Sequence, residues 1–388
     1  MSSIQTIESS EAPKKIYIIA GEVSGDMMAS KIIDALREIS GNLTFYGIGG
    51  EGVQKRGIVS LFDIKRISLM GFLEIIPHIL SIKNLIQSTV DDIKLKNPDI
   101  VITIDSPGFC FRVAKLLRNT CPKIKLMHVV APSVWVYKPG RAKKFATVYD
   151  HLLTLLSFEP PFFEKEGLAS TYIGHPIFEQ EFGGGEAFRK SHGIDKDTKL
   201  ILVTPGSRRG EIVRHLPIFC EAIEKLSKHY PKFIVCCAIV GHEDIVHSYL
   251  KDVSFKYFIA NGDERLQAYA AANAALAKSG TNTLEIAASK TPMIVAYKLN
   301  TLTYFIIKML AKVKYASLIN IIGKSEIIPE FLQFNCTTDK LYTALKGILD
   351  TRAGERQIKD AEEVLRSMGY GSETKPSSVA AKAIMRVI

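Results

Sequence analysis

The chain has 388 residues, and its 50 Lys and Arg against 40 Asp and Glu give a formal net charge of +10. Hydrophobic residues make up 47% and charged residues 23%, which excludes an intrinsically disordered chain, and the length indicates two domains that each bury a full core. The positive charge is compatible with nucleic acid, a phosphorylated substrate or an anionic membrane surface, and composition does not choose between them.

The cysteines favour a reduced compartment, the histidines do not favour a metal site, and the N-terminal residues do not favour secretion. The six cysteines form no CxxC pair and the nine histidines show no ligand spacing, so we expect neither a disulfide framework nor a metal site. The first dozen residues are polar, and no run reaches about 18 uncharged apolar residues, so we expect no cleaved signal and no spanning helix.

Short β-branched runs alternate with helical patterns from Lys15 onward. In the first half, such runs predict strands at 15–20, 43–47, 99–105, 124–130 and 151–156. A helix is predicted near 26–39, after the first of them. Because the runs are hydrophobic throughout, both faces of the sheet are expected to be covered, as in parallel sheets. The pattern predicts a doubly wound α/β domain.

Gly and charged residues replace this pattern at 179–197, which predicts a flexible hinge. Further strands are predicted at 199–204, 233–240, 255–260, 274–279 and 292–297, and only helices follow residue 338. We therefore expect two Rossmann-like doubly wound domains, over 14–180 and 190–364, that face a cleft. Helices are expected at about 365–388, and the sequence leaves open whether they pack on the second domain or on the first. Ligands bind such folds at the carboxyl ends of the strands.

Gly47, Gly49 and Gly52 spell G-x-G-x-x-G, the fingerprint of dinucleotide sites. That site needs a full helix after the glycines and an acidic residue about 20 positions further on. Only EGVQKRG follows before the next apolar run. We do not expect NAD binding.

Polar side chains follow two predicted strands of the first domain. Glu22, Ser24 and Asp26 come after the first strand, and Asp105 ends the strand at 99–105. Ser24, Asp26 or Asp105 as an N-cap of the next helix is one interpretation. Alternatively, Asp105 is a fixed carboxylate that deprotonates a sugar hydroxyl. Glu22 is not needed as a cap and is available to a hydroxylated ligand.

Two loops of the second domain predict phosphate binding. Gly206, Ser207 and Arg208 precede one helix, and Gly280 precedes another in which Glu285 lies one turn in. N–H groups at a helix start bind anions, and an Arg forks onto a diphosphate. Either loop alone is also an ordinary connection. Two such loops on one sheet edge favour binding of a nucleotide diphosphate, with Glu285 accepting hydrogen bonds from the ribose hydroxyls.

Two segments, 69–86 and 299–322, combine a broad apolar face with few polar positions. Core packing is one interpretation, and insertion at an anionic bilayer surface is the other. The residues assigned to such a membrane contact are Met70, Phe72, Leu73, Ile75, Ile76, Ile79, Leu80, Lys308 and Lys312.

The segment 135–144 interleaves aromatic and basic residues, as single-strand binders do. No RRM, KH or helix-turn-helix pattern surrounds it, so nucleic acid is not the expected partner, and a phosphorylated substrate explains it equally well. His175 is either a structural residue or a cleft contact.

Several of these motifs together resemble the lipid A disaccharide synthases, a family of GT-B type glycosyltransferases. The similar segments run in the family's order from about residue 15 to 335. They are GEVSGD (21–26), FYGIGGEG (45–52), IDSPGF (104–109), APSVW (131–135), FEP (158–160), IGHP (173–176), TPGSRRGEI (204–212), KSGTNTLE (278–285) and IPEFLQ (328–333).

The resemblance implies transfer of 2,3-diacylglucosamine from its UDP form to the 6-hydroxyl of 2,3-diacylglucosamine 1-phosphate, which yields a β-1,6 disaccharide and UDP. It implies inversion without a metal or other cofactor, on the cytoplasmic face of the inner membrane. A homodimer is left open. The rivals are a UDP-sugar 2-epimerase or cell-wall precursor transferase of the same fold, and a non-catalytic membrane or nucleic-acid binding protein.

Carried over by motif, Asp105 is the general base or orients the acceptor, and Arg208 holds the donor diphosphate. The further donor contacts implied are Gly206, Ser207, Ser279, Gly280, Thr281 and Glu285. The implied acceptor or cleft contacts are Glu22, Ser24, Asp26, Ser133, Trp135, His175 and Asn320. The positions where the chain departs from the family pattern are Gly108, Cys110, Ser157 and Ile319, and these departures blur the acceptor contacts and the place of Asn320.

Overall fold

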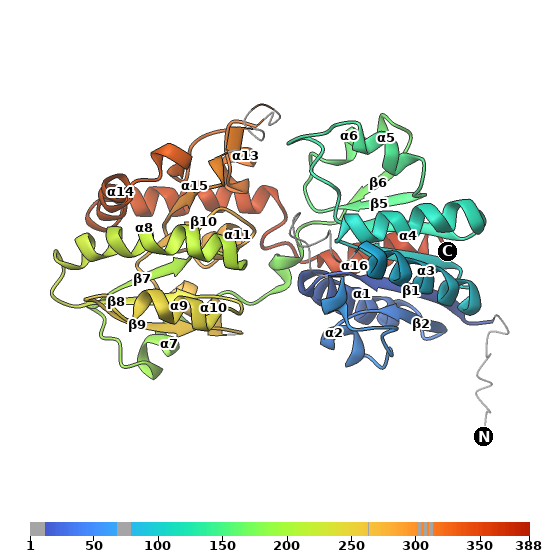
Figure 1. The fold of residues 1–388 in the computed structure, drawn as a ribbon, viewed down its shortest axis with the longest axis horizontal. Helices are drawn as coiled ribbons and strands as arrows, with labels where there is room; N and C mark the ends of the chain where they lie inside the picture. Colours follow the sequence, from blue (N-terminus) through green and yellow to red (C-terminus); the bar gives the residue numbers. More distant parts are fainter. Residues whose placement is uncertain (1–11, 68–78, 263, 302–303, 306–308, 310–312) are drawn as a thin grey trace, which may run out of the picture. The chain divides into compact units, whose positions relative to one another are not determined.

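The computed structural model describes residues 12–67, 79–262, 264–301, 304–305, 309 and 313–388 (Figure 1). The chain divides into two compact units. Unit 1 is Met1–Pro176 with Glu373–Ile388, and unit 2 is Ile177–Ser372. None of the helices within the described ranges is long and apolar enough to cross a membrane.

Unit 1 is built on a six-stranded parallel sheet in the order β2-β1-β3-β4-β5-β6. Its strands are β1 (Lys14–Ala20), β2 (Leu43–Ile48), β3 (Ile100–Ile104), β4 (Lys125–Val129), β5 (His151–Thr154) and β6 (Ala169–Tyr172). Its helices are α1 (Val23–Ile39), α2 (Glu51–Gln54), α3 (Ile79–Lys96), α4 (Pro107–Thr120), α5 (Arg141–Ala146), α6 (Pro160–Glu164) and α16 (Pro376–Met385).

Both faces of this sheet are buried, which is why its strands are apolar throughout. Tyr17 and Ile19 belong to a core with residues of α3 and α4. Ile16 and Ile18 point the other way, into a core with α1 and α16. Figure 1 shows α16, the red C-terminal helix, beside the blue α1. A segment from the far end of the chain therefore completes one face of unit 1.

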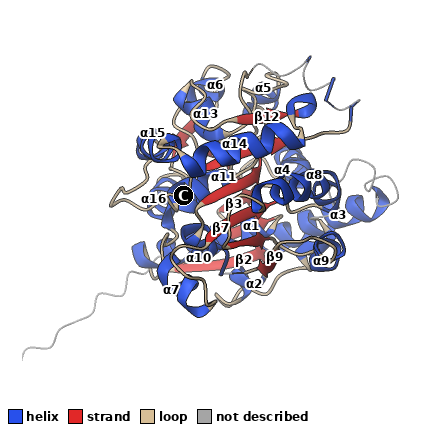
Figure 2. Cartoon of the chain, turned by 90° about the vertical axis from the view of Figure 1, so that its left-hand side faces the viewer, coloured by secondary structure: helices blue, strands red, loops and turns tan. Residues whose placement is uncertain are grey.

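Unit 2 repeats the architecture with the order β12-β11-β10-β7-β8-β9, again all parallel. Its strands are β7 (Lys199–Thr204), β8 (Phe233–Ala238), β9 (Lys256–Ala260), β10 (Ala274–Lys278), β11 (Met293–Tyr297) and β12 (Glu330–Leu332). Its helices are α7 (Gly185–Ser191), α8 (Arg209–Ser227), α9 (Glu243–Leu250), α10 (Glu264–Ala271), α11 (Asn282–Ala288), α13 (Leu318–Gly323), α14 (Thr338–Asp350) and α15 (Ala353–Ser367). Figure 2 shows the red strands with blue helices on either side.

Each sheet has one point where the chain reverses its direction of winding. In unit 1 this switch point lies between β1 and β3, and in unit 2 it lies between β7 and β10. Loops that follow the two strands of a switch point diverge, and ligands bind in the crevice between them. The predicted doubly wound fold is confirmed, and it places the predicted polar loops at these two points.

The predicted hinge at 179–197 is wrong over part of its length, because 185–191 form α7. Phe188 anchors this helix with 1% exposure, and a Cβ on Gly185 would lie 2.4 Å from the Ala270 carbonyl oxygen. One buried apolar residue in a short helix produces no periodic pattern, so the sequence does not indicate this helix. The edge strands β6 and β12 were also not predicted, because they are short and only partly buried.

Candidate active site

The turn after β1 lies against the tip of β3, because these strands pair across the switch point. A side chain does not fit at Gly21, where a Cβ would lie 2.3 Å from the Ser106 Cβ. The close approach brings Ser24 to Asp105, and the Ser24 hydroxyl donates a 3.2 Å hydrogen bond to Asp105 Oδ2. Two predicted site residues, distant in sequence, therefore meet.

Asp105 and Ser106 both have left-handed backbone conformations, with φ of 55° and 44°. Such a residue costs roughly 1–3 kcal/mol and persists where its surroundings impose it. The Asp105 N–H donates to the Val129 carbonyl at 3.1 Å, and Asp105 Oδ1 accepts from the Ser106 N–H at 2.8 Å. The N-cap of α4 is Ser106, so Asp105 as the cap is wrong. The strained turn instead holds a half-buried carboxylate at the strand end.

A second carboxylate lies near this turn. Cys110 is fully buried in α4, and burial, then the charges of Asp105 and Glu22, raise the pKa of its thiol. Both carboxylates are therefore close enough to act on one sulfur atom. Glu22 is the N-cap residue of α1 and makes no side-chain capping bond, so the predicted capping by Ser24 or Asp26 is wrong.

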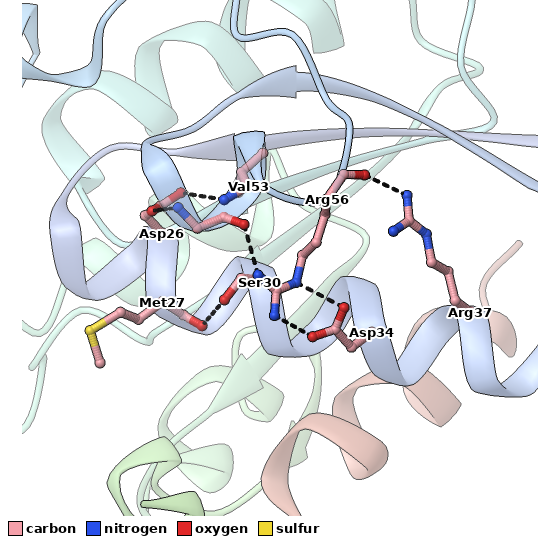
Figure 3. Close-up of polar contacts among 8 residues, drawn as sticks. Asp26, Met27, Ser30, Asp34, Arg37, Val53 and Arg56 are labelled. Atoms are coloured by element: carbon pink, nitrogen blue, oxygen red, sulfur yellow. Dashed lines mark hydrogen bonds and ion pairs between the residues drawn. The ribbon is translucent and has the colours of Figure 1, made fainter.

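Asp26 binds the glycine-rich loop that follows β2 (Figure 3). Its carboxylate accepts from the N–H groups of Gly50 at 2.7 Å, Gly52 at 2.8 Å and Val53 at 3.1 Å. A Cβ on Gly50 or Gly52 would lie 2.9 Å from Asp26 Oδ2. The amides that would hold a phosphate in a dinucleotide site therefore hold an internal carboxylate.

A second set of contacts secures the same loop to α1 (Figure 3). Arg56 forms an ion pair with Asp34 and donates to the Gly52 carbonyl at 2.8 Å. Arg37 donates to the Arg56 carbonyl at 2.8 Å. The glycine-rich loop is thus a structural part of unit 1.

Trp135 is hydrogen-bonded to Glu159, and the two residues lie in the loops that follow β4 and β5. The indole Nε1 donates to Glu159 Oε1 at 3.1 Å, and the Leu156 N–H donates to Oε2 at 3.1 Å. Phe158 packs edge-on against the Trp135 ring at 5.2 Å. Glu159 is 4% exposed, and burial raises the pKa of its carboxyl to about 7 despite the two hydrogen bonds.

We expect Glu159 to titrate visibly near pH 7. Trp135 is the only tryptophan, so its emission reports the charge of the carboxylate that it contacts. The pKa of Glu159 in the folded chain lies above the ordinary value of 4.5, so this group's contribution to stability is present below about pH 4.5 and is lost as the pH rises to about 7. The free energy of unfolding is expected to fall by about 2–4 kcal/mol over this range. Tryptophan emission and urea unfolding are followed from pH 4 to 9 for wild type and for Glu159→Gln. The variant should show neither the emission change near pH 7 nor the loss of stability. An emission midpoint that persists in the variant contradicts the assignment.

The other predicted residues of unit 1 lie around these loops. Ser133 is half-buried, and its carbonyl accepts from the Val136 and Tyr137 N–H groups in the turn after β4. His175 follows β6 and is 7% exposed, and burial lowers its pKa to about 4. It is therefore neutral at physiological pH.

The predicted phosphate loops of unit 2 flank its switch point, after β7 and β10. Gly206 has φ of 129°, and a Cβ there would lie 2.7 Å from the Glu211 Cβ. Arg208 is the N-cap residue of α8, and its side chain is 74% exposed, so the guanidinium group is accessible to a ligand. Ser207, beside it, is also exposed. The start of α8, a helix of 19 residues, is therefore open to an anion.

The second loop is shaped by its own side chains. Ser279 donates to the Ala316 carbonyl at 2.9 Å, and Asn282 donates to Thr204 Oγ1 at 2.8 Å, which ties α11 to the end of β7. Thr281 is exposed at the N-cap of α11, next to Gly280. Glu285 is half-buried, and burial raises its pKa against the opposing effects of Arg265 and a Gln180 hydrogen bond.

Asn320 lies in α13 and is fully buried. Its Oδ1 accepts from the Ile327 and Ile328 N–H groups at 2.9 and 2.8 Å. Its Nδ2 donates to the Ile328 carbonyl at 2.7 Å and to Glu330 Oε1 at 2.8 Å. These four hydrogen bonds use both polar atoms of the amide and join α13 to residues 327–328 and to Glu330, the first residue of β12.

Most residues predicted to contact a membrane lie outside the described residues: Met70, Phe72, Leu73, Ile75, Ile76, Lys308, Lys312 and the side chain of Ile79. Leu80 is described and is 77% exposed. In unit 2, Phe305, Met309 and Phe334 are 50%, 86% and 66% exposed. Tyr304 contacts both aromatic rings, at 5.6 and 5.8 Å. Phe334 was not among the predicted membrane contacts, because it lies outside the apolar segment 299–322.

The family model described as lipid-A-disaccharide synthetase matches residues 16–384. A lipid-A-disaccharide synthase of Rickettsia bellii (strain OSU 85-389) is 52% identical over 377 residues, 96% of this chain and 98% of its own. That of Rickettsia prowazekii (strain Madrid E) is 50% identical over 377 residues, with coverage of 96% and 98%.

Solved structures share the fold at low identity. The glycotransferase of kitacinnamycin has a TM-score of 0.64 at 14% identity, with 97% of this chain and 100% of that chain covered. UDP-GlcNAc 2-epimerase from Neisseria meningitidis, bound to UDP-GlcNAc, has a TM-score of 0.61 at 13% identity, with coverage of 96% and 98%. These likenesses support the fold alone. The relatives at about half identity go further and confirm the resemblance read from the motifs. The chain belongs to the lipid-A-disaccharide synthetase family.

Proposed function

We propose that this chain joins UDP-2,3-diacylglucosamine to 2,3-diacylglucosamine 1-phosphate, forming the β-1,6 disaccharide 1-phosphate and UDP. The observation that carries the proposal is the unlike chemistry of the two switch points. One holds a carboxylate in a strained turn, and the other opens a long helix start beside an exposed Arg. The first suits a hydroxyl that must lose a proton, and the second suits a diphosphate.

In this reaction the acceptor 6-hydroxyl oxygen attacks the anomeric carbon of the donor. The bond from that carbon to the phosphate oxygen breaks, its electron pair leaves with UDP, and the hydroxyl proton passes to Asp105. A single displacement inverts the anomeric centre and needs one base. The Ser24 hydroxyl, bonded to Asp105 Oδ2, fixes the direction of the carboxylate.

The acceptor is assigned to the loops of unit 1. Glu22 and Ser24 line the turn beside Asp105, and Ser133, Trp135 and His175 follow strands at the same edge of the sheet. Val23 and Met27 are 65% and 48% exposed, one turn apart on α1. Exposed apolar side chains beside the polar turn are what an acylated sugar requires.

The donor is assigned to unit 2, with the diphosphate at Gly206, Ser207 and Arg208 and the nucleoside near Ser279, Gly280, Thr281 and Glu285. Helix N–H groups and a guanidinium stabilise charge on departing UDP as a metal ion otherwise does. We therefore assign the stabilisation of leaving UDP to these residues.

Contact with an anionic bilayer on the cytoplasmic face of the inner membrane is part of the proposal, because both substrates carry acyl chains. The exposed group of Phe305, Met309 and Phe334 supports it. We expect Phe334→Ser to reduce flotation with phosphatidylglycerol vesicles, whereas Val240→Ser, at a 50% exposed site, should not. Equal flotation of both variants and wild type contradicts this contact.

A single assay tests the function. The protein is incubated with UDP-2,3-diacylglucosamine and 2,3-diacylglucosamine 1-phosphate, and UDP and disaccharide are measured. Release of UDP together with disaccharide is expected. No product from competent substrates overturns the proposal, and isomerisation of UDP-GlcNAc without transfer would favour the epimerase alternative.

A further inference from the structure

Lys278 is a cation at the donor switch point. It is the first residue of the KSGTNTLE segment, but the sequence assigned it no role. It is the last residue of β10, which pairs with β7 in the sheet. Its side chain is 16% exposed, and its Nζ lies 5.5 Å from the centroid of the Tyr297 ring. A Cβ placed on Gly280 would lie 3.3 Å from the same nitrogen. The ammonium group therefore lies beside the loop assigned to the donor.

Glu211 fixes the position of this ammonium group. It lies in the first turn of α8 with 8% side-chain exposure, and its Oε1 is 3.1 Å from Lys278 Nζ and 3.8 Å from Arg208 Nη1. Its Oε2 is buried and has no hydrogen-bond partner among the described residues. Gly206 makes room for it, since a Cβ there would lie 2.7 Å from Oε2.

The energetics argue against a purely stabilising role for this pair. Moving two charges out of water costs about as much free energy as their attraction provides, unless every polar atom of the pair is hydrogen-bonded. In this pair, Oε2 of Glu211 has no hydrogen-bond partner among the described residues. The contact of Arg208 with the same carboxylate is long and mostly exposed, so it adds little. Two cations and one carboxylate leave one net positive charge where α8 begins.

We propose that Lys278 binds the donor diphosphate together with Arg208, and that Glu211 is the residue that positions Lys278. The inference rests on the proposed function. The ammonium group carries three N–H donors, and the structure gives it one carboxylate partner and one aromatic face among the described residues. When the anomeric carbon–oxygen bond breaks, the electron pair moves to the phosphate oxygen. A fixed cation close to that oxygen stabilises the leaving UDP.

The first test compares UDP with uridine. Calorimetric titration of Lys278→Met is expected to weaken UDP binding by about 10- to 100-fold and to leave uridine binding unchanged, because only the diphosphate meets the ammonium group. The variant should also lower kcat for transfer, and Lys278→Arg should restore most of the UDP affinity. Lys256→Met, at an exposed position of the edge strand β9, removes the same charge and serves as control.

Wild-type protein supplies a second test that does not depend on how a variant folds. Reductive methylation followed by mass spectrometry is expected to modify Lys278 more slowly with UDP than with uridine. Unchanged UDP affinity in Lys278→Met, or an equal loss for UDP and uridine, overturns the role of Lys278. Equal methylation rates with both ligands also overturn it. If wild type binds no UDP and forms no disaccharide, the proposed function itself fails.

Discussion

Asp105→Asn is expected to lower kcat for disaccharide formation by about 10²–10⁴-fold, the usual contribution of a general base. Asn keeps the shape of the side chain and tolerates the left-handed backbone at φ 55°. Its amide oxygen can still accept the Ser106 N–H. What it cannot do is take the proton of the acceptor hydroxyl. The fold and the affinity for UDP should therefore remain, and turnover should be lost.

Asp99→Asn is the matched control, because Asp99 precedes the opposite end of β3 and accepts the Lys15 N–H at 2.8 Å. It should retain transfer, with thermal unfolding followed for both variants. If Asp105→Asn folds and transfers at a near-normal rate, Asp105 is not the base. A variant that lowers acceptor affinity without lowering kcat would mean that the carboxylate only orients the acceptor.

Arg208→Ala is expected to lower kcat/KM for the donor by about 10²-fold or more, with unchanged stability. The side chain is 74% exposed and its ion pair with Glu211 is 3.8 Å long, so its removal costs the folded chain almost nothing. A bidentate guanidinium on a diphosphate, in contrast, contributes strongly both to binding and to the stabilisation of leaving UDP. Calorimetry with UDP separates the binding part from turnover.

Arg366→Ala provides the comparison for this substitution. Arg366 is 71% exposed on α15 and pairs with Glu362, so its removal takes away an equally exposed positive charge from unit 2. Activity and UDP affinity should be unchanged. If Arg208→Ala behaves in the same way as Arg366→Ala, the diphosphate does not bind at the start of α8.

The fold was largely predictable, because buried parallel strands leave continuous apolar runs that local inspection finds. Elements without such a run escaped it. β12 has three residues at a sheet edge, and α7 carries one anchoring Phe. Their positions are set by contacts with distant residues, such as the approach of Gly185 to Ala270. Nothing within the segments themselves specifies them.

The candidate site was predictable where a motif ends a strand and unpredictable where a partner comes from elsewhere. Ser24 and Asp105 each follow a recognisable strand, although their hydrogen bond depends on strand order. Asp26 was assigned to a ligand, whereas its carboxylate binds the N–H groups of the glycine-rich loop. Lys278 and Glu211 both lie in recognisable segments, but their ion pair joins β10 to α8 and could not be read from either one.

The composition of unit 1 has a consequence for the order in which the chain folds during synthesis. Ala380, Ala381 and Ile384 of α16 are fully buried in the core that covers one face of the first sheet. The ribosome makes this helix only after every residue of unit 2. Unit 2 is continuous in sequence and can form its core during synthesis. Unit 1 keeps one apolar face of its sheet uncovered until α16 has been made. The segment made first is therefore completed last, and it is the part of the nascent chain that depends most on protection from aggregation.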